Sequence, residues 1–319
     1  MRSRTMNDRS GMENGPSDTT GETQHGDAAA QQRDARVAVA ERVRAFYAGL
    51  PFNFHTGVES ASAAVQANPV GATYPDLHAL LSRGGVRRAL ELGCGAGWLT
   101  NSLAQHYGVE MTAVDFCAPA LERAREVARL SGVQQRTRFI ESDLFDFKHD
   151  EPFDLVLSMG VLHHTGDAAG GVRHAASFVA PAGHLYIGLY HAPGRRVFLD
   201  ALQGLAAREG EDAAFRRYRE IDTVRQYDET LMRSWFRDQV LHPHETQHTL
   251  RETVAWFTSA GIALESTSIN RFQPLGELEA LFALELTYAE RSRRALEVEK
   301  RYFPGFFTAC GRRVARPTV

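Results

Sequence analysis

The sequence predicts an α/β fold in which helices cover both faces of a mostly parallel seven-stranded sheet whose last strand is antiparallel. Two observations lead to this prediction. Short apolar segments alternate with helical segments between residues 86 and 190, and the first apolar segment ends in a cluster of glycines. Strands separated by helices of this length form parallel βαβ units with right-handed crossovers. Ligands of such sheets bind at the carboxyl ends of the strands.

Seven segments have the apolar pattern of strands. They are residues 86–92, 110–114, 137–141, 153–158, 184–190, 262–269 and 305–310. Helical patterns fill most of the intervals between them, with apolar positions that recur every three or four residues. The helical segments are 35–47, 74–81, 101–107, 118–130, 167–178, 246–259 and 276–299, with mixed helix over 193–245.

Composition divides the chain into three parts. Residues 1–34 carry almost no large apolar side chains. They cannot bury enough surface to offset the entropy of ordering, so we expect a disordered leader there. Residues 35–80 are expected to form an N-terminal helical cap. Residues 81–319 are expected to form the main domain, with insertions at about 193–245 and 271–303.

The bulk composition predicts a protein with a hydrophobic core, because 43% of the residues are hydrophobic and the formal net charge is −3. A protein that lives on a polyanion would be strongly basic, which argues against a nucleic-acid partner. No apolar run approaches the roughly 20 residues of a membrane helix, and the polar N-terminus has no export signal. The unpaired spacing of Cys94, Cys117 and Cys310 indicates a reducing compartment. We therefore expect a cytoplasmic protein without a membrane partner; no feature sets its oligomeric state.

A glycine-rich turn follows the first predicted strand. Residues 91–97 are Glu-Leu-Gly-Cys-Gly-Ala-Gly. Glycines are needed where the chain turns sharply and its backbone approaches a ligand with no Cβ in the way. A dinucleotide site requires Gly-x-Gly-x-x-Gly, and its third glycine would fall at Trp98. The turn therefore argues against NAD or FAD and favours S-adenosylmethionine, which has no phosphate.

The same turn resembles the first motif of the class I, Rossmann-like S-adenosylmethionine-dependent methyltransferases, in which an acidic residue precedes Gly-x-Gly-x-Gly. Further matches follow in the same order as in that family. Asp115 ends the second strand, Ser142-Asp143-Leu144 follows the third, residues 153–164 resemble the fourth motif of the small-molecule branch, and residues 181–184 resemble the turn before strand five. The resemblance covers about residues 70–190 well and the remainder loosely.

The resemblance implies S-adenosyl-L-methionine as the cofactor and a role for several residues. Asp115 would bind the two ribose hydroxyls, Phe116 would lie against adenine, and Asp143 would meet the adenine amino group. Taken alone, the two aspartates would be better explained as helix caps, and Cys94 is expected to be a small buried residue, not a nucleophile. The expected cofactor-binding residues are Glu91, Gly93, Cys94, Gly95, Gly97, Asp115, Phe116, Asp143, Leu144, Ser158 and Met159.

Methyl transfer from a sulfonium is an in-line displacement with a good leaving group. Positioning and desolvation can supply most of the catalysis, and a base is needed only if the nucleophile carries a proton. His163 and His164 are the candidate catalytic residues, because a histidine pair could supply a base or hold a metal. The alternative is that at least one of them packs or caps structurally.

The acceptor is expected above the strand ends, where the two insertions and the segment 47–57 can meet. The richest stretch is 227–248, whose aromatic residues lie beside arginines and suit a flat or anionic small molecule. The alternative is that Trp235 and Phe236 are core and the charges are solvated. Asp238, His242, His244 and His248 have the ligand types of a zinc or iron site, but no complementary cluster exists elsewhere, so we expect no metal. The candidate substrate-binding residues are Tyr47, Asn53, Tyr227, Trp235, Arg237, Asp238, His242 and His244.

These patterns predict transfer of a methyl group to oxygen, nitrogen or carbon of a small-molecule acceptor. One alternative is methylation of RNA or protein, against which the mildly acidic charge and the enclosed-looking site weigh. The other is a regulator that binds S-adenosylmethionine without transferring its methyl group. The glycine turn is compatible with all three.

Overall fold

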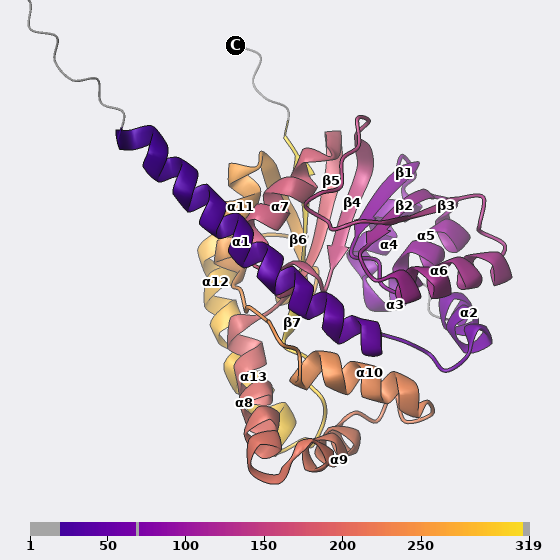
Figure 1. The fold of residues 1–319 in the computed structure, drawn as a ribbon, viewed down its shortest axis with the longest axis vertical. Helices are drawn as coiled ribbons and strands as arrows, with labels where there is room; N and C mark the ends of the chain where they lie inside the picture. The colour runs from indigo at the N-terminus through magenta and orange to yellow at the C-terminus, as the bar shows by residue number, and fades with distance from the viewer. Residues whose placement is uncertain (1–19, 68–69, 315–319) are drawn as a thin grey trace, which may run out of the picture.

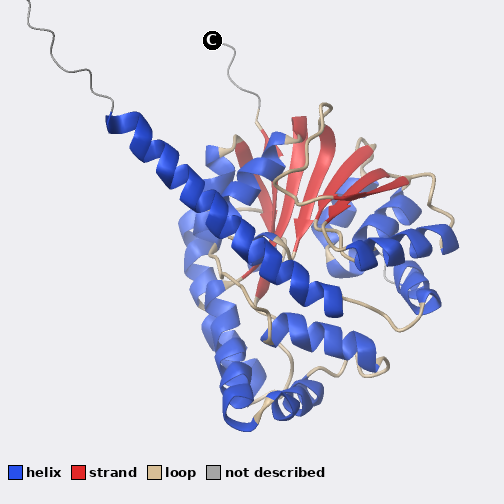
Figure 2. Ribbon diagram, in the orientation of Figure 1, coloured by secondary structure: helices blue, strands red, loops and turns tan. Residues whose placement is uncertain are grey.

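A seven-stranded sheet runs through the centre of the protein, with helices on both of its faces (Figures 1 and 2). The computed structural model describes residues 20–67 and 70–314. The strand order is β3-β2-β1-β4-β5-β7-β6. The strands are β1 (Arg88–Leu92), β2 (Glu110–Asp115), β3 (Thr137–Glu141), β4 (Phe153–Met159), β5 (Val179–Tyr190), β6 (Ile262–Thr267) and β7 (Phe306–Arg313).

The strand directions confirm the predicted fold class. β1 pairs in parallel with β2 and β4, while β7 is antiparallel to both of its neighbours, β5 and β6. The chain fills the sheet outward from β1 to β3 and then returns to the other side of β1 with β4. This reversal of strand order leaves a crevice at the carboxyl ends of β1 and β4, which is where open α/β sheets bind ligands.

The two faces of the sheet carry separate hydrophobic cores, because successive side chains of a strand point to opposite faces. Leu90 and Leu92 pack with α7 and α11, whereas Ala89 packs with α4 and α5. The helices that flank the sheet, with two short turns, are α4 (Pro75–Ser82), α5 (Trp98–Tyr107), α6 (Ala118–Leu130), η1 (Leu162–His164), α7 (Ala168–Ser177), α11 (Leu250–Ser259), η2 (Ser268–Asn270) and α12 (Leu278–Leu286).

Several predicted boundaries move for identifiable reasons. β5 begins at Val179, not at residue 184, because the expected turn around Ala182 is an irregularity within one long strand, where Ala182 has a positive φ of 60°. The helix expected from residue 246 begins at Leu250, because Thr249 and Glu252 form a capping box there. The helix expected over 276–299 is divided at Thr287 into α12 and α13 (Tyr288–Glu297).

The N-terminal helix α1 (Thr20–Gly49) starts well inside the segment predicted to be a disordered leader. Residues 1–19 of that leader lie outside the described residues. The prediction counted large apolar side chains and ignored helix propensity. Alanine and glutamine favour helix, and they make up residues 28–32, so the helix expected at 35–47 extends backward. Two short helices, α2 (Val58–Ala67) and α3 (Val70–Thr73), follow it.

The insertion after β5 folds as three helices with a small core of their own. They are α8 (Ala192–Glu209), α9 (Glu211–Ile221) and α10 (Glu229–Val240). Phe198, Tyr218 and Phe236 lie in that core, and α13 packs beside α8. Among the described helices, none has both the length and the apolar character that a membrane span requires.

Arg195, on α8, joins the insertion to Glu245 and to the residues just before β7. The side chain is completely buried, and its Nε and Nη2 donate to the two carboxylate oxygens of Glu245 at 2.9 and 2.8 Å. The remaining donors reach Gln239 and the carbonyl of Pro304. A buried ion pair adds little net stability compared with an apolar pair of similar size. Loss of one partner, however, leaves the other charge buried without a counter-charge, which is strongly destabilising.

We predict that Arg195→Met lowers the free energy of unfolding by about 3–5 kcal/mol, because Glu245 is left buried without its cation. Arg293→Met is the matched control, since Arg293 is half exposed and pairs with Glu290 on the same helix. That control should change stability by less than about 0.5 kcal/mol. Urea denaturation followed by circular dichroism measures both, and equal effects would contradict the anchoring role.

Candidate active site

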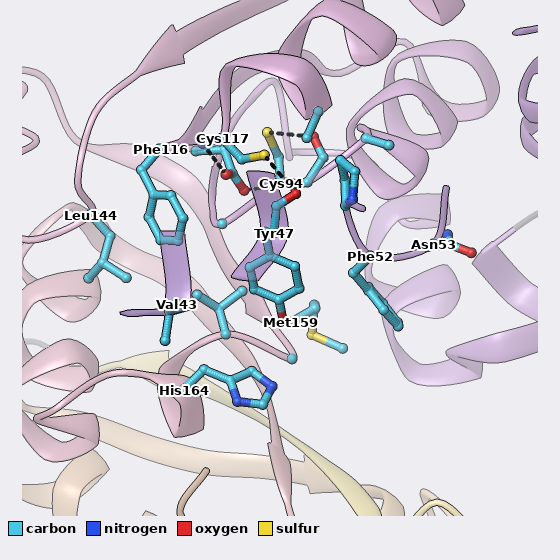
Figure 3. Close-up of a pocket in the computed structure, with 18 of the residues that line it drawn as sticks. Val43, Tyr47, Phe52, Asn53, Cys94, Phe116, Cys117, Leu144, Met159 and His164 are labelled. Carbon is cyan, nitrogen blue, oxygen red and sulfur yellow. Dashed lines mark hydrogen bonds between the residues drawn. The ribbon is translucent and has the colours of Figure 1, made fainter. Parts of the chain in front are cut away.

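A cavity of about 700 Å³ lies at the carboxyl ends of the parallel strands. Residues that follow β1, β2, β3 and β4 form one side, and α1, the segment 51–55 and residues 224–235 form the other. Figure 3 shows Phe116 and Leu144 on one side of Tyr47, with Phe52 and Asn53 on the other. The site is therefore built from the carboxyl ends of the strands together with segments that are distant in sequence.

The three glycines of the turn after β1 have different surroundings. A Cβ on Gly93 would lie 2.3 Å from the side chain of Val161, and one on Gly97 would lie 2.7 Å from Cβ of Ala124. Those two glycines permit close packing. A Cβ on Gly95 would meet no atom within 4 Å, and Gly95 lines the cavity. The backbone at Gly95 is thus the part of the turn that is open to a ligand, while Gly97, a predicted cofactor residue, does not line the cavity.

Asp115 is placed to hold both this turn and a ligand. Its Oδ2 accepts a hydrogen bond from the Gly95 backbone N–H at 2.8 Å, and its Oδ1 accepts one from Cys117 at 2.9 Å. Burial raises the pKa of Asp115 above its ordinary value, and these N–H donors oppose the rise. Each carboxylate oxygen has a second lone pair, so two acceptor positions remain for a pair of hydroxyls.

The residues expected around an adenine ring meet at the same end of the cavity. Phe116, Asp143 and Leu144 line it, whereas Met159 lines the cavity nearer to Tyr47 (Figure 3). Oδ1 of Asp143 accepts a hydrogen bond from the N–H of Phe145 at 2.9 Å. No described residue binds the second oxygen of Asp143. Asp143 caps no helix: one oxygen holds the turn at Phe145, and the other is left available.

Glu91 and Cys94 line the base of the cavity, whereas Ser158 does not. Burial raises the pKa of Glu91 to about 8, and its carboxyl accepts a hydrogen bond from the Thr100 hydroxyl. Burial also raises the pKa of the Cys94 thiol well above its ordinary value, which suits a packing role. Ser158 is corrected as a cofactor residue: it points into the sheet and donates to the Leu92 carbonyl at 3.1 Å, because strand alternation turns it away from the cavity.

The two candidate catalytic histidines differ in position. His163 is fully buried, lies outside the cavity lining, and stacks on the Tyr190 ring at 3.8 Å, so the structure assigns it to packing. His164 lines the cavity. Its Nδ1–H donates to the His244 carbonyl at 2.9 Å, which leaves the Nε2 lone pair free. Burial lowers the pKa of His164 to about 3, so the ring is neutral at physiological pH.

Asp238 forms a buried polar network beneath His164. Its Oδ1 accepts from the Tyr47 hydroxyl at 2.5 Å, and its Oδ2 accepts from Tyr190 at 2.9 Å and from Gln239 at 2.8 Å. Nε2 of His164 is 3.9 Å from Oδ1. Asp238 does not line the cavity, so its expected contact with the substrate is corrected: it positions Tyr47, which does line the cavity.

The other predicted acceptor residues separate into two groups. Asn53, Tyr227 and Trp235 line the cavity, and Trp235 Nε1 donates to Asn53 at 3.1 Å. Phe236 belongs to the core of the insertion. Three expected acceptor residues lie outside the cavity lining: Arg237 donates to the Phe46 carbonyl, His242 stacks on His164 at 3.6 Å, and His244 donates to the Thr165 carbonyl.

His164, Asp238 and His242 have the spacing of a metal site, with one ligand atom of each lying within 4.8 Å of the others. The hydrogen bonds oppose that use of His242. Its Nδ1 accepts from the His244 N–H at 3.2 Å, so the proton of the neutral ring is on Nε2, where a metal would have to bind. The cluster therefore leaves one imidazole lone pair without a partner, on the buried Nε2 of His164, which lies 3.9 Å from Oδ1 of Asp238.

Sequence reasoning missed the arginines that line the cavity. Arg36 and Arg44 come from α1, and Arg225 lies over the Trp235 ring at 3.4 Å. The helical spacing of positions 36, 40, 44 and 47 was a signal, because residues three to four apart share one face of a helix. The signal was overlooked because only Tyr47, of the helix expected over 35–47, was placed near the site.

Comparison with known proteins finds a family match for the segment that contains β1 to β4 and the first part of β5. Residues 89–183 match a family model described as a methyltransferase domain. An uncharacterized protein of Synechococcus sp. is 30% identical over 208 residues, which is 59% of this chain and 50% of that protein. The ubiquinone biosynthesis O-methyltransferase of Stutzerimonas stutzeri is 29% identical over 121 residues, 38% of this chain and 50% of that protein. The chain thus spans about half the length of these curated relatives. The structure of N-methyltransferase NodS from Bradyrhizobium japonicum has a TM-score of 0.40 and 18% identity, and covers 74% of this chain and 90% of that one.

The buried carboxyl of Glu91 should make the stability of the protein depend on pH. Its folded pKa of about 8 lies above its ordinary value of 4.5, so between these values the folded state holds a proton that the unfolded state has lost. Raising the pH through this window therefore reduces stability, by an amount on the order of a few kcal/mol. Glu91→Gln keeps the acceptor for Thr100 and removes the titration. We expect the variant to lose less unfolding free energy than the wild type between pH 5 and pH 8 in urea titrations; equal losses would show that Glu91 titrates normally.

Proposed function

We propose that this chain, whose residues 89–183 form a class I S-adenosylmethionine-dependent methyltransferase domain, transfers a methyl group from that cofactor to oxygen, nitrogen or carbon of a small-molecule acceptor. The observation that carries the proposal is the continuity of one cavity. The same 700 Å³ space reaches from Gly95 and Asp115 to Tyr47, His164 and Trp235. A donor and an acceptor can therefore lie in contact within one cavity.

The strand-end residues support the placement of the cofactor. Asp115 has two acceptor positions left for the ribose diol, Gly95 is open to close approach, and Asp143 keeps one free oxygen for the adenine amino group. The sulfonium would then lie toward Met159, with its methyl group directed at the part of the cavity that α1 and α10 enclose. This placement requires no phosphate site and no metal.

The acceptor half supports an aromatic or otherwise flat small molecule. The ring centroids of Phe52 and Trp235 are 4.7 Å apart, and both residues line the cavity together with Tyr47. We propose that the neutral His164, which lines the cavity and whose buried Nε2 has no hydrogen-bond partner, accepts a hydrogen bond from an O–H or N–H group of the bound acceptor. S-adenosylmethionine would supply the methyl group on a sulfonium, which is a good leaving group, and the residues of this chain would position the nucleophile against it. Because burial lowers the pKa of His164 to about 3, His164 would orient the nucleophile as a hydrogen-bond acceptor, and the nucleophile's proton would leave to water that reaches the cavity.

The relatives support either heteroatom as the target. One is named as an O-methyltransferase and another as an N-methyltransferase. The three described cysteines are free and buried, which fits a reducing compartment such as the cytoplasm.

The first test concerns the cofactor. Asp115→Ala removes two charge-assisted hydrogen bonds to the ribose, each worth about 1.5–3 kcal/mol, so the affinity for S-adenosylhomocysteine should fall by about 100-fold or more. Isothermal titration measures this, with Asp150→Ala as an exposed control that should bind like the wild type. A melting curve checks that the variant is folded, since Asp115 also holds Gly95. A folded variant with unchanged affinity would refute the assignment.

The second test concerns the acceptor. His164→Phe keeps the ring that stacks on His242 and removes Nε2. Turnover with metabolite extract and methyl-labelled cofactor should fall at least about tenfold, while S-adenosylhomocysteine affinity stays within about twofold. Fractionating the labelled products by size separates the alternatives. Label in RNA or protein would overturn the small-molecule proposal, and binding without any transfer would identify a regulator.

A further inference from the structure

We propose that α1 is a lid over the adenosine part of the cofactor, and that the guanidinium groups of Arg36 and Arg44 bind that part of it against Phe145 and Phe116. This inference rests on the proposed cofactor function and adds to it a recognition element outside residues 89–183. None of the expected cofactor residues comes from α1. The elements involved are visible in Figure 1, where α1 crosses in front of the sheet.

One face of α1 borders the cavity. The residues of α1 that line it include Arg36, Ala40, Val43, Arg44 and Tyr47. Positions 36, 40, 44 and 47 are three or four residues apart and therefore lie on one side of the helix, with Val43 next to them. Val43 is buried, and it lies beside Phe116 and Leu144 in Figure 3. The helix therefore faces the same end of the cavity at which adenine is expected.

The two arginines stand over the aromatic residues that follow β2 and β3. The Arg44 guanidinium carbon is 5.3 Å from the centre of the Phe116 ring, and that of Arg36 is 4.3 Å from the centre of the Phe145 ring. Phe116 comes directly after Asp115, and Phe145 comes two residues after Asp143. Arg36 and Arg44 are eight residues apart, or about 12 Å along the helix, so they bracket a ligand about the size of adenosine.

The charge of both arginines is available to a ligand. Neither guanidinium forms an ion pair with a carboxylate of the described residues. A guanidinium is flat, weakly hydrated and stacks on aromatic faces, as adenine does. A flat base that binds beside these stacked pairs would contact guanidinium and ring together.

The carboxyl end of α1 is fastened, which fixes the lid before the cofactor arrives. The Tyr47 hydroxyl donates to Asp238, Arg237 donates to the Phe46 carbonyl, and the Cys117 thiol approaches the Tyr47 carbonyl. The helix ends at Gly49, just before Pro51. Arg44 is one turn from this fastened end, so its position is set by the protein fold.

The experiment measures S-adenosylhomocysteine and 5′-methylthioadenosine binding by isothermal titration in the full chain. The double variant Arg36→Ala/Arg44→Ala should weaken both ligands by about tenfold, and by the same factor, because both ligands contain the adenosine part and only one contains the amino acid. Arg42→Ala is the matched control: it removes an exposed arginine of the same helix that does not line the cavity, and should change neither affinity by more than about twofold. Arg44→Lys keeps the positive charge but loses the planar guanidinium. Its affinity for both ligands should lie between that of Arg44→Ala and that of the wild type.

The outcomes separate this inference from the proposed function. Wild-type affinity in the double variant, with loss of affinity in Asp115→Ala, would overturn the lid and leave the cofactor site intact. An equal loss in Arg42→Ala would also overturn it, because the effect would then come from the helix as a whole. Absence of binding by the wild-type protein would refute the proposed function itself. Circular dichroism and melting temperature establish that each variant is folded.

Discussion

The buried carboxylate of Asp238 is the interaction on which the arrangement of the site depends. It accepts hydrogen bonds from Tyr47 on α1, Tyr190 at the end of β5 and Gln239 on α10. A buried carboxylate without donors costs several kcal/mol, so the three donors and the elements that carry them must stay together. Gln239 also accepts from Arg195, whose guanidinium is neutralised by Glu245. The lid, the sheet and the insertion are therefore joined by one continuous polar network.

This network explains how side chains cover a cavity at the carboxyl ends of the strands. The sheet by itself supplies a crevice between β1 and β4, with Gly95 and Asp115 at its mouth. Tyr47 and Trp235 close the opposite side, and both are held by hydrogen bonds to distant segments, to Asp238 and to Asn53. The polar groups that maintain the enclosure thus lie one layer behind the groups that line the cavity.

The parts of this structure that follow local rules could be predicted from the sequence. The alternation of Ala89 and Leu90 between the two faces, the glycine turn and the acid that ends β2 depend on neighbouring residues, so the fold class and the cofactor end of the cavity were within reach. The acceptor side was not. Its composition indicated a site at Asp238, His242 and His244, but their partners, Tyr47, His164 and Thr165, lie 79 or more residues away in the chain. Only the folded arrangement shows that these polar residues support the cavity wall without lining it. The early start of α1 was missed for a different reason, since composition rules weigh apolar side chains and not the helix propensity of alanine and glutamine.

The central claim is that S-adenosylmethionine occupies the cavity between the strand ends and α1. Ultraviolet cross-linking of the full chain with methyl-labelled S-adenosylmethionine, followed by peptide mapping, tests this directly. The account predicts that label appears on peptides containing Gly93 to Gly97, Asp115 and Phe116, or α1, and that excess S-adenosylhomocysteine abolishes it. Label confined to other peptides, or label that S-adenosylhomocysteine does not displace, would contradict the account.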